Sequence, residues 1–267
     1  MTRLRQSLET ARAAVRVLLL GGNLASLTLA SRPRELVAYL SESLFLLRAM
    51  TGRRGVRQSN VFDVLDCPPT QEITLANLDG DTWLREVPSY TADIVSLCLI
   101  CRALRPRVVF EIGTLHGYTA LHFALNSPEE ATVYTLDLPQ DARPEPALHT
   151  TVVDDAHIKA GTGATRRLFE GTAAAGKIVP LYGDSARFDF SPYHGEVDFF
   201  FIDGAHSYDY VASDTLHALA CARPGGVIAW HDFGRAGVNG VSRLVRELAS
   251  TREIHAVPGG SLAFTVA

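Results

Sequence analysis

The stretch Val108–Thr119 constrains the fold of this chain more than any other part of it. Its apolar start predicts a buried strand, and Glu111 and Gly113 follow that strand at once. Gly117 then leads into Tyr118–Leu125, where apolar residues recur among small ones in a helical pattern. A strand, a glycine turn and a helix in this order are typical of the ligand-binding corner of a doubly wound α/β sheet.

The spacing of the two glycines indicates a ligand without phosphates. A dinucleotide fingerprint has the spacing G-x-G-x-x-G, which brings backbone and a helix N-terminus against a pyrophosphate. Here Thr114, Leu115 and His116 separate Gly113 from Gly117, and the bulky Leu115 stands where the middle glycine would admit the phosphates. The turn therefore argues against a nicotinamide dinucleotide.

Further apolar segments predict a Rossmann-like doubly wound sheet of seven strands with a C-terminal antiparallel hairpin. Most of these segments end in polar residues, and ligands of open α/β sheets lie beyond the carboxyl ends of the strands. After the first strand, the predicted strands are Ala131–Leu136, Lys177–Tyr182, Val197–Ile202, Val227–Trp230, Glu253–Val257 and Leu262–Val266.

The chain divides into a helical N-terminal extension, residues 1–75, and an α/β domain, residues 76–267. Leu36, Val37, Leu40, Leu44 and Leu47 recur at helical spacing in the extension. Because residues 1–60 offer only apolar helical faces, we expect them to serve homo-oligomer assembly or substrate enclosure. Residues 139–176 form a long insertion between two predicted strands, and a loop of this length is usually functional. We expect it to be a lid or a wall of the substrate site.

Composition excludes several other classes of protein. The chain has 267 residues, of which 47% are hydrophobic and 20% charged, as in a globular protein. Its net charge of −4 gives no basic surface for nucleic acid. The uncharged stretch Val17–Ala30 is shorter than the roughly 20 apolar residues that span a bilayer, so we expect no stable membrane span. Cys98 and Cys101 lie in an apolar helical segment and are expected to be buried thiols of a cytoplasmic protein.

Acids at two predicted strand ends suit the adenosyl part of a cofactor. Asp137 ends the second strand, and an acid at this place accepts the hydroxyls of a ribose. Asp184 and Ser185 follow the third strand, where the adenine edge would lie. The alternative for these last two residues is a simple turn, since both types favour turns.

A second group of polar residues suits a divalent metal ion. Asp203 ends the fourth predicted strand, and His231 and Asp232 end the fifth. Carboxylates suit Mg²⁺ or Mn²⁺, and an imidazole favours Mn²⁺, Fe²⁺ or Zn²⁺. His206 follows Asp203 after a tight turn at Gly204. The alternative is helix capping by Asp203 and a packed His231.

As a set, these motifs resemble the metal-dependent O-methyltransferases among the class I S-adenosylmethionine-dependent methyltransferases. The similar branch holds macrocin-type sugar O-methyltransferases and cephalosporin-hydroxylase-like proteins. The resemblance covers about Pro88–Ala267 and rests on the I-D-G-x-H-S-Y motif from Ile202 to Tyr208, the P-G-G-V-I strand and Trp230-His231-Asp232. It implies S-adenosylmethionine as cofactor, Asp137 on its ribose and Asp184 with Ser185 on its adenine. The glycine turn after Glu111 would surround the methionine portion through Gly113, Thr114, Gly117 and Thr119.

The resemblance also implies a mechanism. Asp203, His231 and Asp232 would hold a divalent ion, Mg²⁺ or Mn²⁺, that lowers the pKa of an acceptor hydroxyl. His206 holds the place of a lysine base in related enzymes, and we expect it to titrate near neutrality and take the proton. The acceptor would be a small molecule such as a sugar, a polyketide or another natural product.

Three rival functions remain open at this point. They are a metal-dependent oxygenase-like relative, a protein that binds S-adenosylmethionine without turnover and, less favoured, an NAD-dependent dehydrogenase. One further group imitates a metal site, Asp154-Asp155-Ala156-His157 in the insertion, but no other ligands lie near it in the sequence. We expect its charges to be solvated.

Overall fold

The computed structural model describes residues 56–68, 70–76, 88–139, 145–160, 167–235 and 237–267, together with a few positions between 25 and 40. Most of the helices predicted before residue 60 therefore lie outside the described residues. Among the described positions there, Pro33–Glu35 form a short 3-10 helix, η1. None of the described helices is long and apolar enough to cross a membrane.

The described strands form one eight-stranded sheet in the order β1-β7-β8-β6-β5-β2-β3-β4. Strand β8 runs antiparallel to both neighbours, β6 and β7, and the other pairs are parallel. This arrangement confirms the doubly wound sheet with a closing antiparallel hairpin. The strands are β1 (Arg57–Gln58), β2 (Val108–Ile112), β3 (Thr132–Asp137), β4 (Ile178–Tyr182), β5 (Val197–Ile202), β6 (Ala222–Trp230), β7 (His255–Ala256) and β8 (Ala263–Val266).

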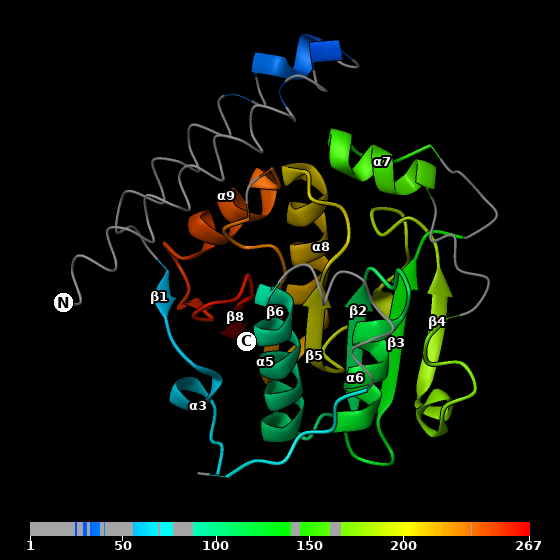
Figure 1. Ribbon diagram of the computed structural model, residues 1–267, viewed down its shortest axis with the longest axis vertical. Coiled ribbons are helices and arrows are strands. Elements are labelled where there is room, and N and C mark those ends of the chain that lie inside the picture. The colour runs from blue at the N-terminus through cyan, green and yellow to red at the C-terminus, as the bar shows by residue number, and fades with distance from the viewer. Residues whose placement is uncertain are drawn as a thin grey trace.

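Helices cover both faces of this sheet (Figure 1). The α-helices are α3 (Val61–Val64), α5 (Pro88–Leu104), α6 (Tyr118–Asn126), α7 (Val152–Ala160), α8 (Tyr208–Cys221) and α9 (Asn239–Leu248). Two further 3-10 helices are η3 (Ala173–Lys177) and η4 (Ser191–Tyr193).

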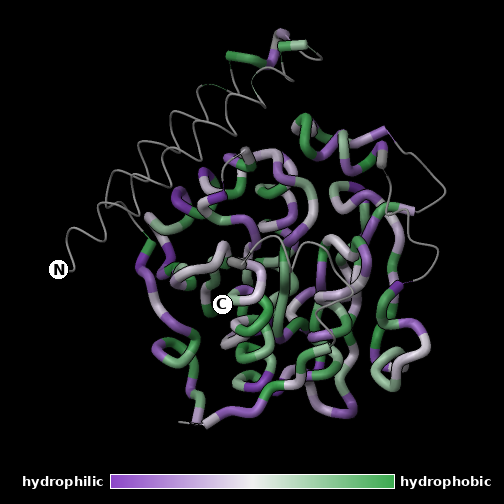
Figure 2. The backbone as a smooth tube through the Cα atoms, in the orientation of Figure 1, coloured by the Kyte–Doolittle hydropathy of each residue, from purple (hydrophilic) through white to green (hydrophobic). Residues whose placement is uncertain are grey.

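Two apolar cores lie on either side of the central strands. Alternate residues of a strand point to opposite faces. Phe199 and Phe201 of β5 therefore pack toward α5 and α6, whereas Phe200 and Ile202 pack toward α8 and α9. Figure 2 shows hydrophobic residues concentrated along these strands. Because both faces are covered, β5 reads as an almost continuous apolar run.

Two elements depart from the sequence prediction. Strand β1 was not predicted, because its two residues are both exposed and carry no apolar pattern. It pairs with β7, and Val61 of the following α3 is only 2% exposed. Part of the segment assigned to the N-terminal extension thus packs with the α/β domain.

Strand β6 begins at Ala222, earlier than predicted, because an irregularity in its pairing with β5 accommodates Gly225 and Gly226.

The parallel register brings the residues after several strands to one edge of the sheet. Ile112 pairs with Ile202, and Ile202 pairs with Trp230. The backbone hydrogen bonds continue one residue further, from Asp203 N to Ile112 O and from His231 N to Ile202 O. The polar residues that follow β2, β5 and β6 are therefore neighbours. Helix α7 of the insertion lies beyond the same carboxyl ends (Figure 1).

Cys98 and Cys101 are both fully buried in α5. Burial raises the pKa of the Cys98 thiol to about 12. Both cysteines are unpaired, so the prediction of buried core thiols is confirmed.

Candidate active site

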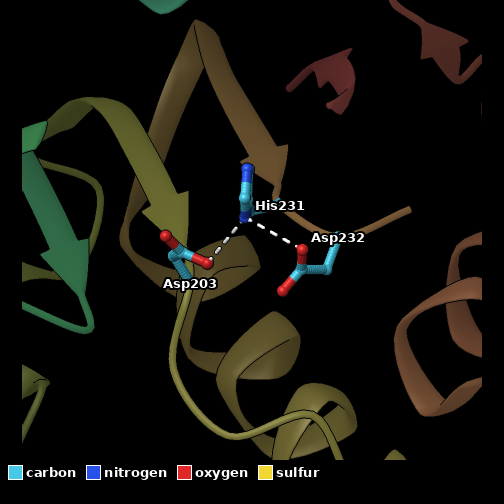
Figure 3. Close-up of side chains that lie close together, drawn as sticks. All are labelled: Asp203, His231 and Asp232. Atoms are coloured by element: carbon cyan, nitrogen blue, oxygen red, sulfur yellow. Dashed lines mark ion pairs between the residues drawn. The ribbon is translucent and has the colours of Figure 1, made fainter. Parts of the chain in front are cut away.

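Three predicted metal ligands converge at the ends of β5 and β6. Their candidate ligand atoms all lie within 4.8 Å of one another. His231 Nδ1 lies 3.0 Å from Asp203 Oδ1 and 3.3 Å from Asp232 Oδ1, and Figure 3 shows one ring nitrogen facing both carboxylates. His231 and Asp232 are buried, whereas the Asp203 side chain is 20% exposed.

These residues fit a divalent ion. Neighbouring ligands of an octahedral ion with bonds of about 2.1 Å lie roughly 3 Å apart, which matches the separations around His231 Nδ1. Among the described residues Nδ1 has no hydrogen-bond partner of good geometry. One competing cation is present, because Arg235 Nη1 donates to Asp232 Oδ1 at 2.6 Å. An ion at this place would share that oxygen with the guanidinium or displace it.

His206 is held between two carboxylates. Its Nε2 lies 2.8 Å from Asp232 Oδ2 and its Nδ1 lies 2.7 Å from Asp154 Oδ1. Burial alone would lower the pKa of His206, but hydrogen bonds to both acids and their charges outweigh burial and raise it to about 10. In this arrangement the two carboxylates thus shift the pKa of His206 upward from the value near neutrality that the sequence predicts, and its role in proton transfer stays a prediction.

Asp154 belongs to the site, and the expectation that its charge is solvated is wrong. The residue is only 3% exposed. Its Oδ1 accepts from the His206 backbone N–H at 2.9 Å in addition to the ring contact, and its Oδ2 accepts from Thr151 N at 2.7 Å. Helix α7 is thereby tied to the loop that follows β5.

The glycine turn after β2 lies directly against the metal-ligand loop. Gly113 has φ +98°, and a Cβ at this position would lie 2.1 Å from the backbone oxygen of Asp203. Only glycine allows this approach. Leu115 also has a positive φ, and the residue is 43% exposed instead of filling the turn. Its backbone N–H donates to Asp137 Oδ2 at 2.8 Å, which fixes the turn to the end of β3.

Glu111 lies beneath this turn and is completely buried. Burial is the main cause that raises its pKa well above the ordinary range, and a hydrogen bond from Thr135 opposes that effect. The Thr135 hydroxyl also lies 2.6 Å from Thr114 Oγ1. Thr119 lies on the first turn of α6 and is half-buried. These residues adjoin the turn as predicted, and their contact with a cofactor remains a prediction.

Asp184 and Ser185 lie beyond β4, and the Asp184 carboxylate already has protein partners. Its Oδ2 accepts from Ala147 N at 2.8 Å and from the Tyr210 hydroxyl at 2.9 Å. Asp184 therefore anchors the start of the insertion to α8. The predicted role of Asp184 and Ser185 on adenine remains a prediction.

Two arginines of the site were not foreseen from the sequence. Arg235 contacts Asp232, as described above. Arg167 is only 4% exposed, and its Nη2 lies 3.8 Å from Asp137 Oδ2. Arg167 comes from the insertion, whose Phe169 ring packs so closely on Gly117 that a Cβ there would lie 2.6 Å from it. No sequence pattern marks these residues, because the contact of Arg167 depends on the folded path of the insertion and that of Arg235 on the turn after β6.

The fold and the site together define a methyltransferase of the class I type. The sheet closes with an antiparallel hairpin, and a glycine turn and strand-end acids meet at its carboxyl edge. In agreement, residues 110–233 match the family described as a methyltransferase domain. The prediction of a class I S-adenosylmethionine-dependent methyltransferase is confirmed to this extent.

Solved structures of low identity are similar to this chain. The O-methyltransferase TomG of Streptomyces achromogenes, involved in tomaymycin synthesis and solved with S-adenosylmethionine, is 19% identical, with 73% of this chain and 92% of that chain covered and a TM-score of 0.48. An O-methyltransferase of Bacillus cereus, solved with S-adenosylhomocysteine, is 20% identical, with 76% and 94% covered and a TM-score of 0.48. These likenesses assign no activity by themselves. Among curated proteins, none matches this sequence significantly.

Proposed function

We propose that this methyltransferase transfers the methyl group of S-adenosylmethionine to a hydroxyl of a small molecule, with the assistance of a divalent metal ion. One observation carries the proposal: Asp203, His231 and Asp232 bring their ligand atoms within 4.8 Å of one another, directly beside the glycine turn after β2. The proposed cofactor turn after β2 and the proposed metal ligands after β5 and β6 would therefore be neighbours. A sugar, a polyketide or another natural product is the proposed acceptor.

On the cofactor side, the chain would bind and orient S-adenosylmethionine. Asp137 stands at the end of β3 with its Oδ1 and Oδ2 engaged by the backbone N–H groups of Leu138 and Leu115. Each carboxylate oxygen can accept more than one hydrogen bond, so the ribose hydroxyls remain acceptable partners. The turn from Gly113 to Gly117 would accommodate the methionine portion.

On the acceptor side, the chain offers Asp203, His231 and Asp232 as ligands and His206 as the proton-transfer group. A divalent ion would supply positive charge that lowers the pKa of a neighbouring acceptor hydroxyl and offsets the carboxylate charge that keeps His206 protonated. Asp154 orients the His206 ring through Nδ1, so that Nε2 faces the Asp232 side of the site. Mg²⁺ is the proposed ion, and Mn²⁺ is the alternative.

A second candidate function rests on the composition of the ligand set. One imidazole and two carboxylates also form the ligand set of non-haem iron oxygenases. An oxygenase-like relative would bind Fe²⁺ here and need no methyl donor. A protein that only binds S-adenosylmethionine would show cofactor affinity without product.

Mass spectrometry of reaction products separates these functions. The protein is incubated with S-adenosylmethionine, Mg²⁺ and a panel of acceptors that carry neighbouring hydroxyls. We expect an acceptor whose mass rises by one methylene, equimolar S-adenosylhomocysteine, and loss of both products in EDTA. Product formation that EDTA does not change would refute metal assistance and leave methyl transfer standing. Cofactor binding without any product across the panel would favour the non-catalytic function.

The role of His206 predicts a separation between binding and turnover. We expect His206→Ala to retain affinity for S-adenosylhomocysteine but to lose about 10²–10⁴-fold in turnover, the usual contribution of a proton-transfer group. The matched control is His194→Ala, since His194 is exposed. Single-turnover rates and calorimetric titrations measure the two properties. Equal rates for both variants on a confirmed acceptor would contradict this role.

The glycine spacing predicts the choice of cofactor. We expect calorimetric titration to show binding of S-adenosylhomocysteine and none of NAD. Asp137→Ala should weaken the binding of S-adenosylhomocysteine by about 1–3 kcal/mol, because polar groups of the ligand would lose their partner. Tight NAD binding without a response to S-adenosylhomocysteine would overturn the cofactor assignment.

A further inference from the structure

A buried aspartate stands behind the predicted metal ligand His231. Asp93 of α5 is only 1% exposed, and its Oδ2 lies 3.3 Å from His231 Nε2. This is the ring nitrogen that faces away from Asp203 and Asp232, as Figure 3 shows. The imidazole of His231 therefore lies between Asp93 on one side and the two other predicted ligands on the other.

The β7–β8 turn holds the Asp93 carboxylate in place. Ser261 N donates to Oδ1 at 2.8 Å, and Ser261 Oγ donates to Oδ2 at 2.8 Å. At Gly260 a Cβ would lie 2.1 Å from Asp93 Oδ1, so the turn can approach the carboxylate only with glycine at this position. Two hydrogen bonds from Ser261 and the close approach of Gly260 thus fix a carboxylate that no strand-end motif includes.

The same face of α5 also restricts the ring of His231. Tyr90 lies one helical turn before Asp93, and its ring meets the His231 ring edge-on with centroids 4.9 Å apart. Ser261 Oγ lies 3.5 Å from His231 Nε2. The ring therefore has contacts along its edge and at Nε2, whereas Nδ1 is directed only toward Asp203 and Asp232.

We propose that Asp93 is a positioning residue for metal binding, which accepts the Nε2–H of His231 and so keeps Nδ1 as the nitrogen that ligates the ion. The neutral imidazole carries its single proton on one nitrogen, and a partner for that proton selects the tautomer. Partners of this kind orient the histidine ligands of metal sites, and their loss typically lowers metal affinity about 10–100-fold. This inference rests on the proposed metal site of Asp203, His231 and Asp232.

Calorimetric titration with Mn²⁺ tests the proposal without any acceptor. We expect Asp93→Asn to bind Mn²⁺ about 10–100-fold more weakly than the unaltered protein, with unchanged affinity for S-adenosylhomocysteine. The control is Asp198→Asn, because Asp198 accepts from the backbone of Arg107 and Val108 far from the metal ligands. Ser261→Ala leaves Asp93 in place and should cause a smaller loss than Asp93→Asn.

The outcomes separate this inference from the proposed function. If the unaltered protein binds Mn²⁺ and Asp93→Asn and Ser261→Ala bind it equally well, the role of Asp93 is refuted and the metal site stands. If the unaltered protein binds no Mn²⁺, the metal site itself is refuted, and the role of Asp93 with it. In the Mg²⁺-loaded protein, ¹⁵N–¹H correlation spectra should show a proton on His231 Nε2 and none on Nδ1. A proton on Nδ1 would refute the inference even if Asp93→Asn fails to fold.

Discussion

At the residue scale, the burial of Asp214 makes the stability of the protein depend on pH. It lies on α8 and is completely buried. Burial raises the pKa of Asp214 to about 7, the nearby Asp184 adds to this effect, and Ser185 opposes it. The native state therefore keeps a proton on Asp214 at pH values where the unfolded chain, with a pKa of about 3.9, has lost it.

This difference predicts the direction of a pH effect. Because the pKa is raised in the native state, the contribution of Asp214 to stability is fully present below about pH 4 and is lost as the pH rises through about 7. The loss amounts to up to about 4 kcal/mol. Asp214→Asn does not titrate, so it should gain stability relative to the unaltered protein between about pH 5 and about pH 8. Denaturant unfolding at about pH 5 and about pH 8 measures the free energy of unfolding of both proteins. A difference between the two proteins that is the same at both pH values would contradict the prediction.

Which site residues could be predicted from the sequence depended on their position relative to strands. Asp203, His231 and Asp232 directly follow apolar runs, and parallel register brings such positions together without knowledge of side-chain packing. Asp154 and Asp93 are different, because each reaches the site only through the path of a separate helix. Asp154 contacts His206 across 52 positions of sequence, and no local pattern encodes such a contact.

At the element scale, Asp154 attaches α7 to the loop that follows β5 at the carboxyl edge of the sheet. The described start of the insertion is also held by Asp184, which accepts from Ala147 N, and by Arg187, which donates to Glu145 O. We expect Asp154→Asn to weaken the attachment of α7, because a neutral amide loses the charge-assisted contact with His206.

Hydrogen exchange followed by mass spectrometry measures that attachment. Amides of residues 152–160 should exchange about 10-fold or more faster in Asp154→Asn, since local opening would require less free energy. The control is Asp155→Asn, because the Asp155 carboxylate accepts from the Thr150 hydroxyl of the same segment. Equal exchange in the two variants would show that Asp154 does not hold the helix.

Element boundaries were predictable where apolar runs were long. Strands β2, β3 and β5 have strong apolar patterns, and polar residues or turns follow them. Strand β1 has two exposed residues and gains its structure only from pairing with β7, so its sequence carries no signal. Strand β6 begins earlier than its apolar run because Gly226 lies close to the backbone of β5, where a Cβ would be 2.9 Å from Asp198 O.

At the scale of the whole molecule, the role of the first residues is open to a direct test. Every predicted cofactor and metal residue follows Pro88, and β1 completes the sheet from Arg57 onward. We propose that the residues before Val56 serve assembly or substrate enclosure. A shortened chain beginning at Val56 should then retain affinity for S-adenosylhomocysteine and change its oligomeric state. Light scattering that gives the same state for both chains, together with equal activity, would refute this proposal.

The attachment of α7 has a consequence for attempts to redesign this enzyme. The insertion is the natural segment to exchange when a different acceptor is wanted, because it borders the site without belonging to the sheet. Such a graft would also remove Asp154 and leave the His206 imidazole with Asp232 as its only carboxylate contact among the described residues. Swapped segments should therefore preserve an acid at this position. A swap that removes this acid would change the surroundings of His206, the proposed proton-transfer group, along with the acceptor site.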